Sequence, residues 1–274
     1  MPKPREGVEW QAIDILDRDA ARAAMARVAP RAVYHCAAAA NAGRSWSRTA
    51  ATLATNVRGT QFVLEAAAAL GDGVPVMVPS SAMVYRPADH PLHEDDPLQP
   101  PNPYGLTKLA VEMLVSRMVT EGVDIRVARP FNHIGARQYP SFVASDFARQ
   151  IVEIERGLRS REIVVGNLEA RREMTNVRDT VRAYELVMAR GVAGRPYNVS
   201  SGKAYSIREL LDRLIAHARV SVRVRVDPSK FHPNDQPLLV GDPTRIRTEL
   251  GWEAAISFDD TLEEVLEYWR RTET

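Results

Sequence analysis

The sequence predicts an α/β fold, a doubly wound parallel sheet with a smaller C-terminal α/β lobe, and three observations lead to that prediction. Short apolar runs at residues 74–78 and 125–128 are typical of buried strands. Residues 46–70 carry apolar side chains at helical spacing between strand-like segments. Ser80 and Ser81 directly follow the run at 74–78, and open α/β sheets bind ligands at the carboxyl ends of their strands.

Composition limits the kinds of partner. The 274 residues are 45% apolar, which is enough for a sizeable core, and the net charge of +1 argues against a nucleic-acid or membrane surface. The single cysteine, Cys36, excludes an internal disulfide and is compatible with a reducing cytoplasm. Because the chain shows no signal peptide and no apolar stretch of membrane-spanning length, we expect a cytoplasmic protein.

The beginning of the chain departs from the usual pattern of a nucleotide-binding α/β fold. Such folds open with a strand, a glycine-rich turn and a helix whose N-terminus holds a pyrophosphate. Here residues 1–7 are a short polar lead, residues 8–13 predict a strand that would ordinarily come third, and no Gly-x-x-Gly-x-x-Gly occurs. We therefore expect a sheet that lacks its first strand-helix-strand unit, through either a late start in the gene model or a real shortening.

Tyr104 and Lys108 are the clearest candidates for chemistry. Pro103 precedes them, and proline discourages helix in the residue before it, which places a helix start here. Four residues apart, the two side chains share one helical face. A cation beside a phenol favours the phenolate, so Lys108 should lower the pKa of Tyr104 and let it exchange a proton with a hydroxyl or carbonyl. The alternative is a tyrosine at a helix start beside a solvated lysine.

Residues 86–103 are rich in proline, aspartate and histidine and predict a loop near the ligand. His90 and His93 stand beside acidic residues in this segment, but no metal-ligand spacing recurs. We therefore expect no metal.

The run from Pro79 to Tyr85 (PSSAMVY), taken with the Tyr-x-x-x-Lys pair, resembles the extended short-chain dehydrogenase/reductases of the NAD-dependent epimerase/dehydratase family. The resemblance covers about residues 8–270 and implies a Rossmann-like sheet, NAD or NADP as cofactor and a nucleotide-sugar substrate. In that family a serine or threonine four residues before the tyrosine of the first run joins the Tyr-x-x-x-Lys pair. Carried over by position, the implied catalytic residues are Ser81, Tyr104 and Lys108.

The same resemblance assigns residues to the cofactor. Asp14 would bond the adenine amino group, and Asn56 matches a residue that supports the active-site helix. Ala37 and Ala38 match a His-x-Ala-Ala run beside the ribose and phosphate. NAD and NADP are not distinguished, because the residue that reads the adenosine 2′ position normally ends the missing second strand. The implied cofactor set is Asp14, Ile15, Ala37, Ala38, Asn56, Ser80, Tyr104, Lys108, Pro130 and Phe131.

The most specific run is residues 129–138 (RPFNHIGARQ), which closely resembles a segment of GDP-4-keto-6-deoxy-mannose reductases and their dehydratase relatives. By this resemblance, Pro130 and Phe131 would flank the nicotinamide. Asn132 would contact the sugar or its phosphates, with His133 nearby.

Further substrate contacts are implied in the C-terminal half. Arg172 ends a Gly-Asn-Leu-x-Ala-x-Arg match and would bind the diphosphate, because a guanidinium holds phosphate oxygens in pairs. Solvated arginines at 171 and 172 are the alternative. Relatives usually have arginine where this chain has His232, and histidine is a shorter and weaker phosphate ligand. Many relatives have a ribose-binding glutamate where this chain has Asp235. The implied substrate set is Ser81, Met83, Asn132, His133, Arg172, His232 and Asp235.

The residue at position 83 distinguishes dehydration from reduction among the possible reactions. In dehydratases of the family an acid–base carboxylate lies two residues before the tyrosine of the first run, and Met83 cannot carry a proton there. We therefore expect NAD(P)H-dependent reduction of a GDP-linked 4-keto-6-deoxy hexose, as in GDP-rhamnose synthesis. A nucleotide-sugar 4-epimerase or 4,6-dehydratase stays open, and so does an inactive truncated homologue that serves as a binding or assembly subunit.

The expected organisation has two parts. Residues 1–140 would form the truncated dinucleotide-binding domain and residues 141–274 mainly the substrate lobe, with 175–200 returning to the main sheet. In relatives, helices equivalent to 46–70 and 104–121 pair across a homodimer, which the resemblance implies here as well. Core packing would produce the same apolar stripes on these helices.

Overall fold

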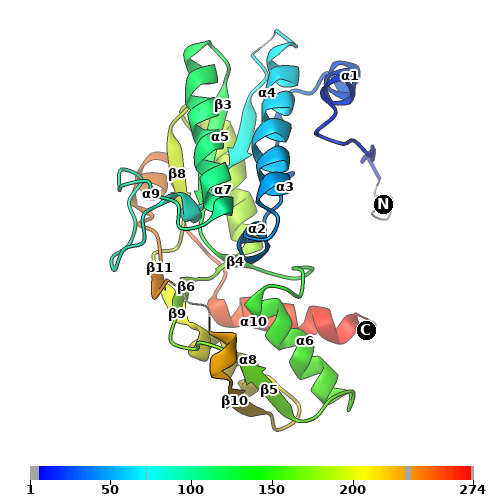
Figure 1. The fold of residues 1–274 in the computed structure, drawn as a ribbon, viewed down its shortest axis with the longest axis vertical. Coiled ribbons are helices and arrows are strands. Elements are labelled where there is room, and N and C mark those ends of the chain that lie inside the picture. Colours follow the sequence, from blue (N-terminus) through cyan, green and yellow to red (C-terminus); the bar gives the residue numbers. More distant parts are fainter. Residues whose placement is uncertain (1–5, 72, 232–235, 273–274) are drawn as a thin grey trace. The chain divides into compact units, whose positions relative to one another are not determined.

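The structure, a computed structural model, describes residues 6–71, 73–231 and 236–272. The main sheet has the strand order β1-β2-β3-β8, and β1 (Val33–Tyr34) runs parallel to β2 (Val76–Pro79). Helices alternate with these strands along the chain, which confirms the predicted α/β class with a parallel sheet (Figure 1).

The chain divides into two units. The first comprises Met1–Val84, Pro100–Val127 and Val192–Arg195, and the second comprises Tyr85–Gln99, Ala128–Gly191 and Pro196–Thr274. The functional division at residues 140 and 141 that the sequence suggests stays a prediction.

The core of the first unit packs helices against β2 and the start of β3 (Ile125–Pro130). Leu64 and Ala67 contribute from α4 (Thr60–Ala68), and both are shielded almost completely from solvent. Val111 and Val115 share one face of α5 because they are four residues apart. The remaining helices of this unit include α1 (Arg18–Val28), α2 (Ala42–Ser45), α3 (Thr49–Leu53) and the longer α5 (Pro103–Thr120).

The strand predicted over residues 8–13 is wrong. This segment has no regular secondary structure, and Val8, Trp10 and Ile13 are exposed. A strand is held by hydrogen bonds to a neighbouring strand, and none of the described strands pairs with residues 8–13. The apolar pattern alone is therefore not enough to form a strand here.

The helix expected over residues 46–70 is interrupted. α3 is followed directly by the π-helical segment Ala54–Gly59, and α4 begins at the next residue. π-helical turns are rare, interrupt α-helices and are frequently found at functional sites.

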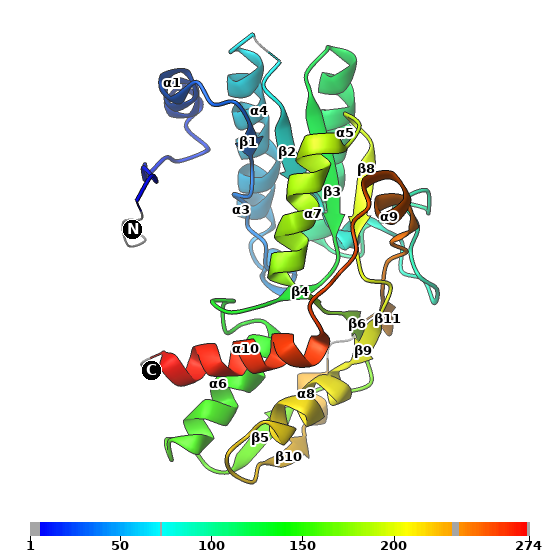
Figure 2. The same ribbon diagram turned by 180° about the vertical axis from the view of Figure 1, so that it is seen from behind.

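In the second unit, short strands form small sheets: β5 pairs with β10, β4 pairs with β7, and β6 lies between β11 and β9. The strands are β4 (His133–Ile134), β5 (Glu162–Val165), β6 (Arg171–Glu173), β7 (Thr175–Asn176), β9 (Ala204–Ser206), β10 (Arg223–Val226) and β11 (Leu238–Leu239), together with β8 (Pro196–Val199) of the main sheet (Figure 2). The helices are α6 (Val143–Glu155), α7 (Val177–Arg190), α8 (Ile207–Ala216), α9 (Thr244–Leu250) and α10 (Phe258–Arg271).

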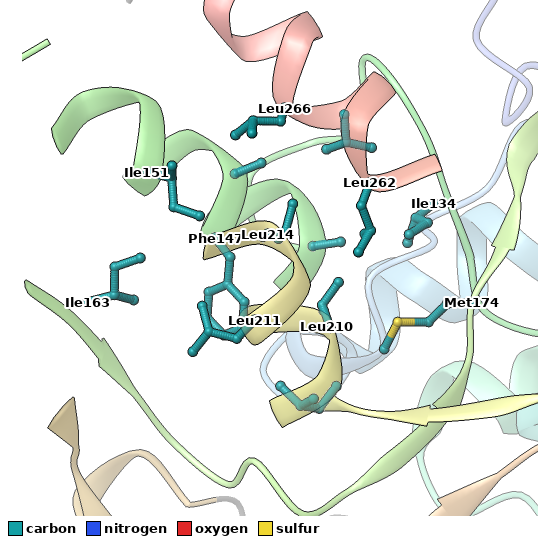
Figure 3. Close-up of a cluster of buried hydrophobic side chains, with 14 of the residues drawn as sticks. Ile134, Phe147, Ile151, Ile163, Met174, Leu210, Leu211, Leu214, Leu262 and Leu266 are labelled. Atoms are coloured by element: carbon teal, nitrogen blue, oxygen red, sulfur yellow. The ribbon is translucent and has the colours of Figure 1, made fainter. Parts of the chain in front are cut away.

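The core of the second unit lies among α6, α8 and α10 (Figure 3). Each helix presents apolar side chains four residues apart, so each pair shares one face. Full burial of one such side chain contributes about 1.5–3 kcal/mol. The pairs are Phe147 with Ile151, Leu210 with Leu214, and Leu262 with Leu266. Within the described ranges, no helix combines the length and the apolar content needed to cross a membrane.

Candidate active site

α5 begins where the sequence predicts, because Asn102 and Pro103 define its first turn. Asn102 Oδ1 accepts a hydrogen bond from the Gly105 N–H at 2.8 Å, and Pro103 takes the first helical position. The Tyr104 N–H donates to Ser45 Oγ at 3.2 Å. The start of the helix that carries Tyr104 is therefore held from two sides.

The structure brings Ser81, Tyr104 and Lys108 into one cluster at the carboxyl end of β2. The side chains of Ser81 and Tyr104 are hydrogen-bonded to each other, and Ser81 Oγ also accepts from the Met83 N–H at 3.1 Å. Lys108 Nζ lies 5.9 Å from the centroid of the Tyr104 ring and donates to Pro79 O at 2.7 Å. A phenol, a hydroxyl and an ammonium thus converge where α/β sheets bind ligands.

The predicted lowering of the Tyr104 pKa by Lys108 is wrong. Burial raises the pKa of Tyr104, and the hydrogen bond with Ser81 opposes this without reversing it. Lys108 directs its ammonium at Pro79 O, and burial lowers the pKa of Lys108 to about 8, although Cys36 and Glu112 act in the opposite direction. The Tyr104 phenol is therefore protonated at neutral pH, which is the state that a proton donor needs.

Asn56 links the segment after β1 to α5. It lies buried in the π-helical turn, where its Oδ1 accepts from the Ala39 N–H at 2.7 Å. Its Nδ2 donates to Ala39 O at 3.3 Å and to Thr107 Oγ1 at 2.9 Å. Ala37 is exposed and Ala38 is half-buried in the segment that Asn56 holds. The geometry therefore agrees with the supporting role that the resemblance implies.

The side chains of Ser80 and His35 contact other residues of the first unit through hydrogen-bonding groups. Ser80 Oγ donates to Glu112 Oε1, one helical turn beyond Lys108 on α5. His35 is buried, its Nε2 lies 2.9 Å from Thr60 Oγ1, and burial lowers the pKa of His35 to about 4, with Lys108 contributing. His35 is therefore neutral and packs α4 against the end of β1.

Asp14 and Ile15 lie in a turn before α1. Asp14 Oδ1 accepts from the Leu16 N–H at 2.9 Å, and Asp17 caps α1. Ile15 packs directly on Gly59, where a Cβ would lie 2.7 Å from Ile15 Cδ1. A larger residue at Gly59 would force the Ile15 side chain to shift.

In the second unit, Pro130 ends β3 and the Phe131 ring is buried. The ring stacks on Tyr85 with centroids 6.3 Å apart. His133 Nδ1 lies 3.1 Å from Phe131 O, and burial lowers the pKa of His133 while that contact opposes the shift. Asn132 is exposed, so its side chain is open to a ligand.

Arg172 is half-buried on β6, and its Nη1 donates to Arg171 O at 2.9 Å. Arg171 is exposed and donates from Nη2 to Ala204 O at 2.7 Å. His232 and Asp235 lie outside the described residues.

A family model described as GDP-mannose 4,6 dehydratase matches residues 2–265. The chain belongs to this family. It is 36% identical over 244 residues to GDP-6-deoxy-D-mannose reductase of Pseudomonas aeruginosa, a match that covers 88% of this chain and 80% of that protein. It is 34% identical over 244 residues to a dTDP-glucose 4,6-dehydratase of Streptomyces griseus, with 87% of this chain and 71% of that protein covered.

A solved structure, that of RMD from Pseudomonas aeruginosa complexed with NADPH, gives a TM-score of 0.89 at 33% identity and covers 95% of this chain and 88% of its own. A putative epimerase from Burkholderia cenocepacia gives 0.86 at 30% identity, with 99% of this chain and 88% of that chain covered. The predicted membership of the epimerase/dehydratase group of extended short-chain dehydrogenase/reductases, and its Rossmann-like fold, are confirmed.

In this member of the GDP-mannose 4,6-dehydratase family, Glu94 is a buried residue that no sequence signal marks. Residues 86–102 form a loop, as expected, and the Glu94 side chain in it is fully buried and accepts a hydrogen bond from the Asn198 N–H at 2.8 Å. No spacing signal marks a contact between residues so far apart in the chain. Among the described residues, no group of three or more His, Cys, Asp or Glu side chains could hold a metal ion.

Gly105 has no room for a side chain, because a Cβ there would lie 2.1 Å from Met83 O. We expect Gly105→Ala to destabilise the protein by about 1–3 kcal/mol and to displace Tyr104. Thermal unfolding followed by circular dichroism measures the change. Gly43→Ala in α2 is the matched control, since its Cβ would lie 3.4 Å from the nearest atom, and it should be neutral or stabilising. Equal melting temperatures for the two variants would refute the close approach.

Proposed function

We propose that this protein reduces the 4-keto group of a GDP-linked 4-keto-6-deoxy hexose, with NADH or NADPH as the reductant. The observation that carries the proposal is the Tyr104 phenol, whose pKa is raised by burial and which is hydrogen-bonded to Ser81. Reduction of a ketone consumes one proton, and a positioned phenol in its protonated state can supply it. The 36% identity to a GDP-6-deoxy-D-mannose reductase supports the choice of substrate.

Ser81 and Tyr104 would act on the same substrate oxygen. As the carbonyl becomes an alkoxide, Tyr104 Oη donates its proton and Ser81 Oγ hydrogen-bonds to the oxygen, which stabilises the developing negative charge. The hydrogen bond with Ser81 favours the phenolate left on Tyr104. Lys108, with a pKa of about 8, is mostly protonated at neutral pH, and its ammonium donates to Pro79 O.

The nicotinamide cofactor supplies the hydride when it is bound. Lys108 would bond the nicotinamide ribose, Ala37 and Ala38 would lie beside the ribose and phosphate, and Asp14 would hold the adenine. Ile15, Asn56 and Ser80 would support these groups, and Pro130 and Phe131 would flank the nicotinamide. Ala37 is exposed, and Asn56 holds the nearby Ala39, which leaves room for such a ligand beside Ala37. Among the described residues, no strand leads through a glycine-rich turn into a helix N-terminus, which is the usual site for a pyrophosphate. The described residues therefore fit the adenine and nicotinamide ends of the cofactor better than its pyrophosphate.

Met83 favours reduction over dehydration. Elimination of water from the sugar needs an additional acid–base group, and the thioether of Met83 cannot serve as one. Met83 Sδ accepts a hydrogen bond from Asn102 Nδ2 at 3.5 Å, so the side chain is held by the residue that caps α5. Substrate contacts in the second unit are proposed for Asn132, His133 and Arg172, and also for His232 and Asp235.

The test is to follow NADPH and NADH absorbance while the keto-sugar nucleotide is added to the purified protein. The proposal expects one equivalent of reduced cofactor to be consumed per sugar, with none consumed when the sugar is omitted. An epimerase or a 4,6-dehydratase would convert its sugar nucleotide without net consumption of cofactor. Consumption of neither cofactor in the presence of the ketone would overturn the proposal.

The proposal includes a homodimer through the helices over residues 46–70 and 104–121, in a cytoplasmic setting. Leu106 and Met113 on α5 are 51% and 68% exposed, which leaves apolar side chains for a partner helix to cover. We expect Met113→Glu to convert a dimer into a monomer, measured by light scattering after gel filtration. Val181→Glu, at an exposed position on α7, is the control and should remain dimeric. A monomeric wild type, or a dimeric Met113→Glu, would contradict this interface.

A further inference from the structure

Glu94 is a buried carboxylate with an unusual environment. Its side chain has no exposure to solvent, and Oε1 accepts from the Asn198 N–H at 2.8 Å. Oε2 has no hydrogen-bond partner and lies 3.6 Å from Arg245 Nε and 3.7 Å from His93 Nε2. Burial of this carboxylate costs desolvation that its ion pair with Arg245 repays only in part, so an apolar side chain would serve better if Glu94 only filled space.

Glu94 closes a ring of buried polar groups. The Glu94 backbone oxygen accepts from Arg129 Nη1 at 2.9 Å, and the same Nη1 donates to Tyr85 Oη at 2.8 Å. Tyr85 Oη in turn donates to Asn198 Oδ1 at 2.6 Å, and the Asn198 N–H returns to the Glu94 carboxylate. We call these four residues, Tyr85, Glu94, Arg129 and Asn198, the Glu94 ring. It joins the segment 85–99 to the end of β3 and to β8.

The Glu94 ring is in direct contact with Phe131. The Tyr85 ring stacks on the Phe131 ring at 6.3 Å with an interplanar angle of 28°, and the Arg129 guanidinium lies 4.9 Å from the Tyr85 centroid on one of its faces. On another side, the Phe131 ring fills the space beside Gly241, where a Cβ would lie 2.5 Å from Phe131 Cε2.

The segment 85–99 also contacts Gly241, which lies on the second side of the Phe131 ring. Leu92 forms a parallel bridge with Gly241, and the Leu92 N–H donates to Val240 O at 2.9 Å. Asn198 Nδ2 donates to Leu92 O at 2.8 Å, which ties this bridge to the Glu94 ring. The Phe131 ring is therefore contacted on two sides by Tyr85 and by Gly241 of the Leu92 bridge, and Tyr85 and Leu92 are both hydrogen-bonded to Asn198, whose N–H donates to Glu94.

We infer that Glu94 is a positioning residue, which acts through Arg129, Asn198 and Tyr85 to fix the Phe131 ring. This inference rests on the proposed function, in which Phe131 flanks the nicotinamide. A change at Glu94 should disturb the reaction by shifting the cofactor relative to the ketone, without any contact between Glu94 and the reacting atoms. Misplacement of reacting groups by as little as one ångström costs up to about 10²-fold in rate.

The experiment measures kcat, the KM for NADPH, the KM for the keto-sugar nucleotide and the melting temperature of Glu94→Leu and Tyr85→Phe. Glu94→Leu removes the acceptor for the Asn198 N–H and keeps the space filled. Tyr85→Phe keeps the ring that stacks on Phe131 and removes the hydroxyl, and it serves if Glu94→Leu does not fold. We expect kcat/KM for NADPH to fall about 10-fold in each variant, with the KM for the sugar nucleotide nearly unchanged.

Asp95→Asn is the matched control, because Asp95 neighbours Glu94 and pairs with the same Arg245 at 2.8 Å but is largely exposed. It should keep wild-type kinetics. A lower melting temperature with unchanged kcat and KM in the folded variants would show a merely structural role and overturn the inference. An equal loss of kcat/KM for NADPH in Asp95→Asn would also overturn it. If the wild type itself consumes neither NADPH nor NADH, the proposed function fails first, and that result is distinct from an active wild type with unaffected variants.

Discussion

A Tyr104→Phe variant is expected to lose about 10²–10⁴-fold in kcat for ketone reduction while it keeps its fold. Phenylalanine retains the ring that lies 5.9 Å from Lys108 Nζ, but it removes the hydroxyl that is bonded to Ser81. Because that hydroxyl is the proposed proton donor, the loss should fall on kcat rather than on the KM of either substrate. Steady-state kinetics with NADPH and the keto-sugar nucleotide measure both.

Tyr268→Phe is the control for Tyr104→Phe. Tyr268 lies on α10 in the second unit, where its ring makes an edge contact with Trp269, and it has no part in the proposed chemistry. Removing its hydroxyl should leave kcat unchanged. If Tyr104→Phe also kept wild-type turnover, the proton would have to come from another group and the proposed mechanism would fail.

The residues that could be predicted from the sequence are those fixed by local geometry. Tyr104 and Lys108 share a face because a helix places residues four apart above one another, and Asn102 and Pro103 set where that helix begins. Ser81 follows from the end of an apolar run. Each of these inferences needs only a few neighbouring residues, and in each case the structure places the side chain in the expected cluster.

What could not be predicted depends on distant parts of the chain. The pKa of Tyr104 is raised because burial outweighs its hydrogen bond with Ser81, and burial is a property of the folded protein. Residues 8–13 have a strand-like pattern, yet a strand needs a partner and none of the described strands provides one. Glu94 depends on Asn198, 104 positions along the chain, so its burial leaves no mark on the surrounding sequence.

Replacing Lys108 by methionine is expected to stabilise the protein at neutral pH and to abolish reduction. Burial lowers the pKa of Lys108 from 10.5 to about 8, so holding the ammonium in the fold costs about 3 kcal/mol. Methionine also reaches into the site but carries no charge. Pro79 O would lose the hydrogen bond that it accepts from the charged Nζ at 2.7 Å, which offsets about 1.5–3 kcal/mol. The expected net gain is therefore at most about 1.5 kcal/mol in the free energy of unfolding.

The pH dependence identifies the cause of this gain. Between pH 8 and 10.5 the unfolded wild type binds more protons at Lys108 than the folded protein does, so wild-type stability rises with pH through this window. The advantage of Lys108→Met should therefore shrink from neutral pH towards pH 10.5, as measured by urea unfolding of both proteins without cofactor. Lys203→Met, at an exposed lysine, should differ from the wild type by a constant amount. If the stability advantage of Lys108→Met did not change with pH, burial of the ammonium could not be its origin. If the variant is inactive and its stability advantage shrinks as the pH rises, this lysine is retained for chemistry at the expense of stability.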